Sequence, residues 1–398
     1  MCCSEKTENC LLQTCFDCKG RKVNYQPHDE KQQFKYVSWE TVTEERNGKG
    51  DKPISVKVTK KVEKNVSVKE GKSALEKMLP ERMEHEGRII HQMKEWKYPQ
   101  ETLTKNDLLL IIDWSENWES KCEAEIQSMH FGGSRQQFSL HTGFAQTSDR
   151  TETFCTASDV IRHDPSAIYA HLKPILDRYI TPEIENLHVK SDGPITQYRS
   201  RKMFYIVSQY ITRKYPQLKR VYWNFTEAGH GKDIPDGVGG TMKGIADRAV
   251  AHGTDIQTLD QFVEALCQKG LKTHVRGVSK IEIDQADKDL IIPEFKSFVG
   301  TMKIHQYTWV VTRPTQIVCK TLSCYQCPRD LMCNHFVLGL PYEMAKPALA
   351  VRSVGVGNVS QTSKKKGNKS FKGNERKSRQ PRRRKINHVR IVIVPNFR

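Results

Sequence analysis

Three aspartates of this chain stand beside strand-like runs, where their carboxylates could come together. Asp113 ends an apolar run, Asp192 ends an alternating run, and Asp236 lies between an aromatic run and a glycine-rich helix start. Carboxylate oxygens are the preferred ligands of hard cations, and two such ions about 3.5–4 Å apart can drive phosphodiester cleavage. The pattern therefore predicts a two-metal site for Mg²⁺ or Mn²⁺. The three runs are 108–112, 187–191 and 221–226.

The third acid of this site has two candidates, Glu227 and Asp236. A loop of Gly, His and Lys leads directly into Asp236 and the helix behind it, which favours Asp236. A helix cap is the alternative role for Asp236, because an Asp side chain accepts hydrogen bonds from backbone N–H groups at a helix start. In the loop, we expect His230 to contact the scissile phosphate or to position water, and Lys232 to bind phosphate.

Basic residues in two places indicate a nucleic acid as the partner. Arg199, Arg201 and Lys202 follow Asp192 and could hold backbone phosphates, although a solvated helix face explains them equally well. The net charge of the chain is +18, and the segment 364–385 holds twelve Lys or Arg against one acid, which gives +11. Such a basic tail is typically disordered and suits DNA attraction or nuclear targeting. We expect DNA as the partner, the nucleus as the location, and a targeting patch of Arg382, Arg383, Arg384 and Lys385.

Cysteines supply a second kind of chemistry. The chain has 12 Cys and no apolar N-terminal leader, which favours metal binding over disulfides. Four thiols within fifteen residues indicate a metal site, and four closed ligands make it a structural zinc site rather than a catalytic one. Their spacing also resembles that of plant-type iron–sulfur sites, but the fourth ligand would be unusually near. These four residues are Cys319, Cys324, Cys327 and Cys333.

A weaker cysteine pattern lies at the start of the chain. Cys10, Cys15 and Cys18 can present three thiolates to one zinc ion, with Cys2 or Cys3 as a fourth ligand. The remaining cysteines are isolated and are expected to be ordinary buried thiols.

The elements that must position these residues form an α/β chain. Strands and helices alternate over 106–252 in the order β-β-β-α-β-α-β-α, which predicts a mixed sheet flanked by helices. No apolar run approaches the roughly 18 residues of a membrane helix. We expect five parts: a Cys knuckle with a small β element (1–70), a helical lead-in (71–105), the core (106–252), an accessory α+β unit with the zinc knuckle (253–350), and a disordered basic tail (351–398).

Five motifs carry a resemblance that covers roughly residues 75–335. The chain resembles a group of uncharacterised, transposon-derived proteins of animal genomes, and that group is similar to the ribonuclease-H-like transposase and integrase superfamily. The motifs are IIDWSENW (111–118), QSMHFGGSRQQFSLHTG (127–143), RHDPSAIYAHLKP (162–174), SDGPITQYRSRKMFY (191–205) and WNFTEAGHGKDIPDGVGGTMKGIADR (223–248).

The resemblance implies a ribonuclease-H-like fold, Mg²⁺ or Mn²⁺ as cofactor, and DNA transposition as the ancestral activity. It makes Asp113 the first-strand acid and Asp192 the fourth-strand acid, with Asp236 or Glu227 as the third, which departs from a clean D-D-E pattern. Transposase or nuclease activity is one expectation, with no membrane or small-molecule partner and with room for a homo-oligomer. A domesticated, catalytically inactive nuclear DNA-binding or chromatin-binding protein is the alternative.

Overall fold

The computed structural model describes residues 3–4, 7–47, 53–124, 135–231, 233–267, 271–295, 300–327 and 333–344. The chain divides into two compact units. Residues Gly20–Arg82 form the described part of the first unit, and Cys2–Lys19 together with Met83–Leu349 form the second. No helix among the described residues is long and apolar enough to cross a membrane. The predicted basic tail and its patch Arg382–Lys385 lie outside the described residues.

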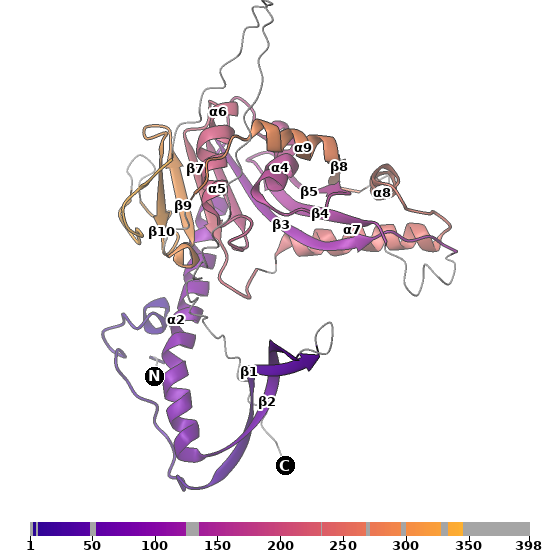
Figure 1. Ribbon diagram of the computed structural model, residues 1–398. Coiled ribbons are helices and arrows are strands. Elements are labelled where there is room, and N and C mark those ends of the chain that lie inside the picture. Colours follow the sequence, from indigo (N-terminus) through magenta and orange to yellow (C-terminus); the bar gives the residue numbers. More distant parts are fainter. Residues whose placement is uncertain are drawn as a thin grey trace, which may run out of the picture. The chain divides into compact units, whose positions relative to one another are not determined.

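A long β-ribbon dominates the first unit. Strands β1 (Gln33–Asn47) and β2 (Pro53–Ser67) are antiparallel and pair with each other along their whole length (Figure 1). Helix α2 (Val68–Glu101) follows β2 directly, because Glu70 accepts hydrogen bonds from the backbone N–H and the hydroxyl of Ser67 at its start. The helix expected within the lead-in 71–105 begins three residues earlier, at Val68, and it continues into the second unit.

One mixed sheet of nine strands organises the second unit, in the order β11-β10-β9-β7-β6-β3-β4-β5-β8 (Figure 1). Strand β3 is antiparallel to β4 and parallel to β6, and β6 is parallel to β7. The mixed sheet flanked by helices confirms the α/β prediction. The strands are β3 (Asp107–Glu119), β4 (Gln137–Gln146), β5 (Thr151–Ser158), β6 (Asn186–Ser191), β7 (Arg220–Phe225), β8 (Thr273–Gly277), β9 (Gln306–Val310), β10 (Gln316–Lys320) and β11 (Tyr342–Glu343).

The structure corrects the expected separation at residue 252. Strand β8 is parallel to β5 at one side of the sheet, and β9 is antiparallel to β7 at the other. Residues 253–344 therefore do not form a separate accessory unit, but extend the sheet on both sides. The physical reason is that β5 and β7 would otherwise leave unpaired N–H and C=O groups along exposed edges.

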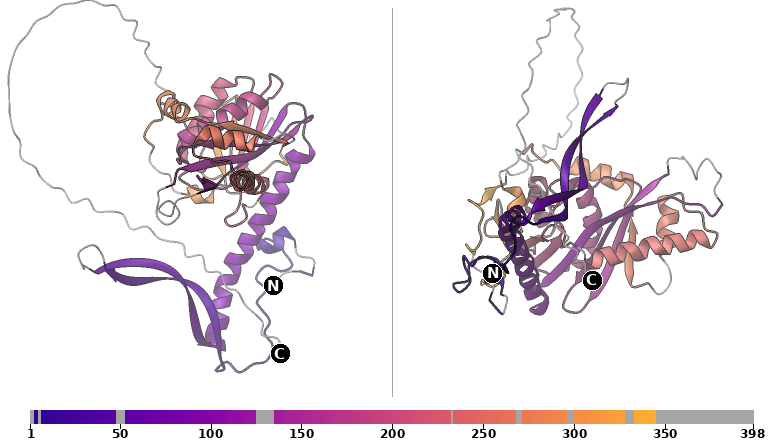
Figure 2. Two further views of the ribbon diagram at one scale, coloured as in Figure 1. Left: turned by 90° about the vertical axis from the view of Figure 1, so that its right-hand side faces the viewer. Right: turned by 90° about the horizontal axis from the view of Figure 1, so that it is seen from below.

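Helices cover both faces of the sheet (Figure 2). Apolar residues of α4, α5 and α9 pack on one face, and those of α7 and α8 pack on the other. The helix expected over 198–215 is continuous, but its middle is a π-helical segment, η1. The helices are α1 (Glu8–Leu11), α4 (Pro165–Tyr179), α5 (Arg201–Ile206), η1 (Val207–Ile211), α6 (Thr212–Lys214), α7 (Ile234–Ala251), α8 (Leu259–Leu266), α9 (Lys280–Asp289) and η2 (Thr301–Lys303).

Strand β3 shows why a continuous apolar run forms the centre of this sheet. Side chains alternate along a strand, and Leu108 and Leu110 enter the cluster beneath α4 and α5. Leu109 and Ile111 point the other way and pack against Trp96 of α2. A strand buried on both faces needs apolar residues at every position, which explains the unbroken run. By the same alternation, Asp113 belongs to the face of Leu109 and Ile111.

Candidate metal centres

Asp113 and Asp192 come side by side where two parallel strands separate. The last paired residues of β3 and β6 are Ile112 and Ser191, and the two aspartates follow immediately. Asp113 is not at the end of its strand, as the sequence suggested, because β3 continues to Glu119 alongside β4. Strand β6 ends at this point, so β3 is not paired with β6 beyond Ile112.

Burial and repulsion between acids dominate the electrostatics of this pair. Burial and the charges of Asp192 and Asp236 together raise the pKa of Asp113 to about 7, against the lowering effect of the N–H of Trp114, 2.8 Å from Oδ1. Burial raises the pKa of Asp192 to about 6, against the lowering effect of Arg199. Oδ1 of Asp192 is buried without a hydrogen-bond partner. A bound cation would satisfy this oxygen and relieve the repulsion.

Asp236 reaches the same place from the first turn of α7. The helix begins at a capping box in which Asp233, not Asp236, is the N-cap residue. The N–H of Asp233 donates to Oδ2 of Asp236 at 2.9 Å, and Nζ of Lys190 lies 2.6 Å from Oδ2 of Asp233. A Cβ on Gly239 would overlap the side chain of Ser115 in β3, so a larger residue would push the helix away from the sheet. The cap and this glycine therefore place Asp236 beside Asp113 and Asp192.

Glu227 occupies different surroundings. Its carboxylate accepts hydrogen bonds from Nδ1 of His85 at 3.1 Å, from Nε of Arg88 at 2.9 Å and from Nε2 of His305 at 2.8 Å. Burial alone would raise the pKa of Glu227, but His305 and Arg88 outweigh burial and hold it below its usual range. Asp236, and not Glu227, contributes to the raised pKa of Asp113, so the geometry favours Asp236 as the third acid.

The three aspartates are neighbours, but they do not close on a single point. Among the described residues, only two groups of three or more have ligand atoms that all lie within 4.8 Å of one another: one consists of four Cys, and the other of three Cys and one His. We call this arrangement of carboxylates open, because their oxygen atoms are not all within 4.8 Å of one another, unlike the ligand atoms of the two cysteine-rich groups.

The predicted loop residues lie near Asp192. A Cβ on Gly231 would be 3.7 Å from Cβ of Asp192, which places the loop against this aspartate. His230 is exposed, and its ring centroid lies 5.4 Å from that of His85. Lys232 lies outside the described residues.

Arg199 does not occupy the exposed helix face that the sequence suggested. It is only 5% exposed, its Nη1 donates to the carbonyl of Met302 at 3.0 Å, and its guanidinium lies 4.9 Å from the ring centre of Phe225. It folds inward because Gly193 has no side chain, since a Cβ there would overlap the guanidinium. Arg201 is partly buried with its guanidinium 4.8 Å from the ring centre of Phe295, whereas Lys202 is exposed as expected.

The C-terminal cysteine group has a different composition from the prediction. Cys319 is buried in β10 and belongs to the main core, because strand alternation points it inward. Its place is taken by His335, whose Nδ1 lies 3.2 Å from Sγ of Cys327 and 3.8 Å from Sγ of Cys324. Sγ of Cys333 lies 3.5 Å from Sγ of Cys324. Three Cys and one His could bind a metal such as zinc.

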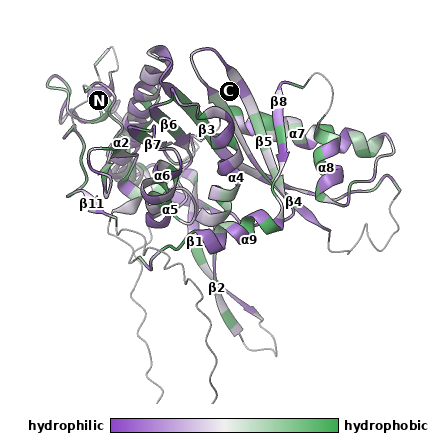
Figure 3. Cartoon of the chain, turned by 90° about the horizontal axis from the view of Figure 1, so that it is seen from above, coloured by the Kyte–Doolittle hydropathy of each residue, from purple (hydrophilic) through white to green (hydrophobic). Residues whose placement is uncertain are grey.

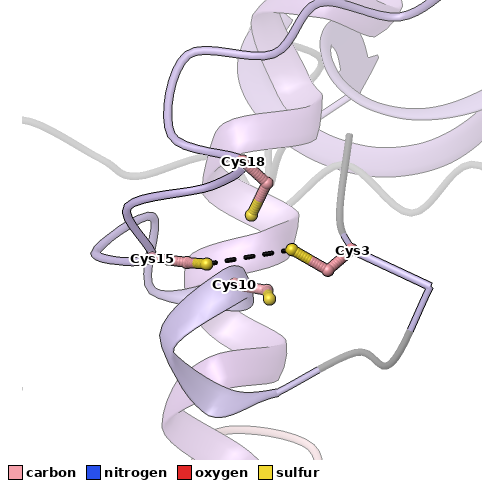
Figure 4. Close-up of side chains that lie close together, drawn as sticks. All are labelled: Cys3, Cys10, Cys15 and Cys18. Atoms are coloured by element: carbon pink, nitrogen blue, oxygen red, sulfur yellow. Dashed lines mark hydrogen bonds between the residues drawn. The ribbon is translucent and has the colours of Figure 1, made fainter.

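The N-terminal group gathers four sulfur atoms around one point (Figure 4). Cys10, Cys15 and Cys18 belong to it as predicted, and Cys3 is the fourth member, with its Sγ 3.8 Å from that of Cys15. Thr7 caps α1, and its hydrogen bonds lower the pKa of Cys10 to about 6. A thiolate is the form that binds metal, so this group could also hold a metal such as zinc.

Helix α2 holds both cysteine groups in place. Nδ1 of His91 lies 2.6 Å from Oε1 of Glu8 in α1, and its Nε2 lies 2.7 Å from the carbonyl of Ser323, next to Cys324. Glu95 accepts the N–H of Tyr325 at 2.6 Å. The sequence assigned His91 and Glu95 no specific role, because their hydrogen-bond partners lie far away in the sequence.

These features define an α/β protein with three neighbouring aspartates and two cysteine-rich groups that could bind a metal. Residues 92–323 match a family described as a domain of unknown function (DUF8701), and the chain belongs to this family. The matched part contains the three aspartates and Glu227 and ends just before Cys324. Neither a curated protein nor a solved structure matches the chain.

Proposed function

We propose that this protein binds DNA and cleaves or transfers phosphodiester bonds at a two-metal site formed by Asp113, Asp192 and Asp236. The observation that carries the proposal is the raised pKa of Asp113 and Asp192 together with the unpartnered Oδ1 of Asp192. A divalent cation would stabilise such buried carboxylates, because it would offset their repulsion and bind the oxygen that has no hydrogen-bond partner.

The topology of the sheet supports a ribonuclease-H-like core. The central strands have the order β5-β4-β3-β6-β7, with β3, β4 and β5 antiparallel and with β6 and β7 parallel to β3. In such a core the first strand carries one acid, the fourth strand carries the next, and the helix after the fifth strand carries the third. Asp113, Asp192 and Asp236 occupy these positions.

In this function, bound Mg²⁺ or Mn²⁺ would activate the attacking water or hydroxyl and stabilise charge on the phosphate. The chain contributes the carboxylates that hold the ions and the exposed His230 on the loop against Asp192, which can contact the phosphate. Lys202 is available to bind a backbone phosphate, and Lys190 fixes the N-cap through Asp233. Arg199 acts from beneath the site, by lowering the pKa of Asp192.

Zinc is our proposal for the two cysteine-rich groups, with a structural role. Metal analysis of the reduced full-length chain should give two equivalents. Cys333→Ser should remove one equivalent, whereas Cys319→Ser should keep both. Equal losses from the two variants would restore the four-cysteine prediction.

A catalytically inactive DNA-binding protein is the second candidate. It is favoured by the open arrangement of the aspartates, whose ligand atoms are not within 4.8 Å of one another. A labelled duplex distinguishes the two candidates: Mn²⁺-dependent nicking that Asp113→Asn abolishes supports the enzyme. Duplex binding without nicking, unchanged in Asp113→Asn, supports the inactive protein.

The basic tail is the proposed element for DNA attraction and for nuclear location. Removing residues 364–398 should weaken duplex binding and flatten its salt dependence, because each neutralised phosphate contributes a slope of about −0.9. The truncated chain should also accumulate less in nuclei. An unchanged salt slope would show that the tail does not contact DNA.

A further inference from the structure

The ribbon formed by β1 and β2 has two different faces. Directly paired residues share a face, and Val42 opposite Val58 marks the one we call the valine face. On the opposite, polar face, Thr41 pairs with Thr59, and their hydroxyl oxygens lie 3.2 Å apart. The valine face comprises Phe34, Tyr36, Ser38, Glu40, Val42, Glu44, Arg46, Ile54, Val56, Val58, Lys60, Val62, Lys64 and Val66.

Each charged side chain on the valine face has an oppositely charged partner within the ribbon, although three cations share two carboxylates and leave a net charge of +1. Lys64 pairs with Glu40, and Nζ of Lys60 lies 3.0 Å from Oε1 of Glu44. Arg46 also contacts Glu44, at 3.4 Å. A partner could therefore cover this face without burying an unpaired charge, which would be costly. The chain as a whole, in contrast, carries a net charge of +18.

Within the described part of the first unit, this face lacks a second layer. The ribbon is a two-stranded sheet, and Phe34 at its base packs on α2, against Gly71. Ile54, near the other end, is 48% exposed. An isolated pair of strands is marginally stable in water and needs a layer that covers its apolar side. Figure 3 shows the hydrophobic patches of β2.

We propose that the valine face binds the valine face of a second copy of this chain. Strands of 15 residues at about 3.4 Å per residue form a ribbon roughly 50 Å long and about 10 Å wide, so two copies would bury roughly 1,000 Å² in total. That area is about the minimum for a specific interface. A two-fold axis needs one self-complementary patch per chain, and the valine face, whose apolar residues form a stripe and whose charges are all paired within the ribbon, can be such a patch.

Nucleic acid fits the other face better. Lys57 and Lys61 lie on the polar face, and Nζ of Lys61 lies 5.4 Å from the ring centre of Trp39. A β-ribbon with lysines and an aromatic ring suits phosphates and bases, whereas each cation of the valine face is already paired with a carboxylate of the ribbon. The dimer would leave the polar faces outward.

Sedimentation equilibrium of the full-length chain over a concentration series tests the proposal. Wild type should be a dimer that dissociates on dilution. Val58→Lys should weaken dimerisation about a hundredfold or more, because each dimer would bury two unpaired ammonium groups. Thr59→Lys places the same charge one residue further on the polar face and should leave the dimer unchanged.

A second variant separates loss of the interface from loss of the ribbon. Val58→Thr with Val62→Thr keeps the β-branched shape that strands favour and should weaken the dimer about tenfold while β1 and β2 stay protected from hydrogen exchange. A monomeric wild type at every concentration overturns the proposal, as does equal dissociation by Thr59→Lys. A monomer whose valine-face amides lose protection when residues 386–398 are removed would also overturn it, because the chain's own end would then be the cover.

Discussion

Glu227 and Asp113 are both half-buried carboxylates near the same face of the sheet, but their surroundings are opposite. Glu227 receives three hydrogen bonds from two histidines and an arginine, and its pKa lies below its usual range. Asp113 receives one hydrogen bond from the backbone and has two further aspartates as neighbours, and its pKa rises to about 7. Basic side chains therefore surround Glu227, whereas acidic side chains surround Asp113.

The difference shows how to distinguish a carboxylate that stabilises the fold from one that could bind a metal, when both follow strands of the same sheet. A carboxylate with its own cationic partners stabilises the fold and has little to gain from a metal. A carboxylate that repels neighbouring carboxylates is stabilised most by binding a divalent cation, because the cation offsets that repulsion. Substitutions should therefore have opposite effects at the two sites.

The largest effect is expected for Glu227→Gln. Removing this charge takes the carboxylate partner from His305 and leaves Arg88 only its exposed partner Glu84, which should lower the free energy of unfolding by about 3 kcal/mol. Mn²⁺ binding at the aspartates should stay unchanged. Urea unfolding and calorimetric titration measure the two quantities, with Glu84→Gln as the control, because Glu84 is an exposed partner of the same arginine. Loss of Mn²⁺ binding in Glu227→Gln would make Glu227 the third ligand after all.

Asp113→Asn should act in the opposite direction. Without metal at neutral or higher pH, the variant should be more stable than wild type by about 2 kcal/mol, because burial and repulsion no longer oppose ionisation. Added Mn²⁺ should stabilise wild type against urea but not the variant. A variant less stable than wild type in the absence of metal would show that Asp113 makes a favourable structural interaction.

The pH dependence of stability should sharpen the contrast further. The pKa values of Asp113 and Asp192, about 7 and about 6, lie above the ordinary value of about 3.9, so the folded chain retains protons that the unfolded chain releases. Stability of the metal-free chain should therefore fall as pH rises from about 4 to 7, by up to about 1 kcal/mol per pH unit. Glu227 has the opposite sign, and its contribution should be lost only as pH falls below about 4. Saturating Mn²⁺ should remove the fall between pH 4 and 7, and a fall that persists would argue against metal binding here.

The sequence predicted the neighbours of Asp113 better than those of Glu227, for a physical reason. Each aspartate directly follows the part of its strand that pairs with the other, so an apolar run before each acid was enough to predict Asp113 and Asp192 side by side. The partners of Glu227 come from α2 and from the residue before β9, and no local pattern links His85 or His305 to it. Likewise, spacing treats Cys319 and Cys324 as equivalent ligands, whereas strand alternation buries Cys319 in the core and leaves its role to His335. The α+β pattern beyond residue 252 predicted strands there, but not that β8 and β9 join the central sheet, because only long-range pairing attaches them to β5 and β7.

Asp236 belongs to both sides of this comparison, because its side chain takes part in a helix cap and is also a candidate metal ligand. Its Oδ2 accepts the N–H of Asp233, which leaves Oδ1 for a cation. Asn can keep the cap through its own Oδ1 but has no charge, so Asp236→Asn should change stability by less than about 0.5 kcal/mol and weaken Mn²⁺ binding about tenfold. Asp236→Ala loses the cap as well, and should cost about 1 kcal/mol more in unfolding free energy for a similar loss of affinity. Calorimetric titration and urea unfolding of both variants separate the two roles. If Asp236→Asn binds Mn²⁺ as wild type does, Asp236 is a cap alone, and the site holds its ion through Asp113 and Asp192.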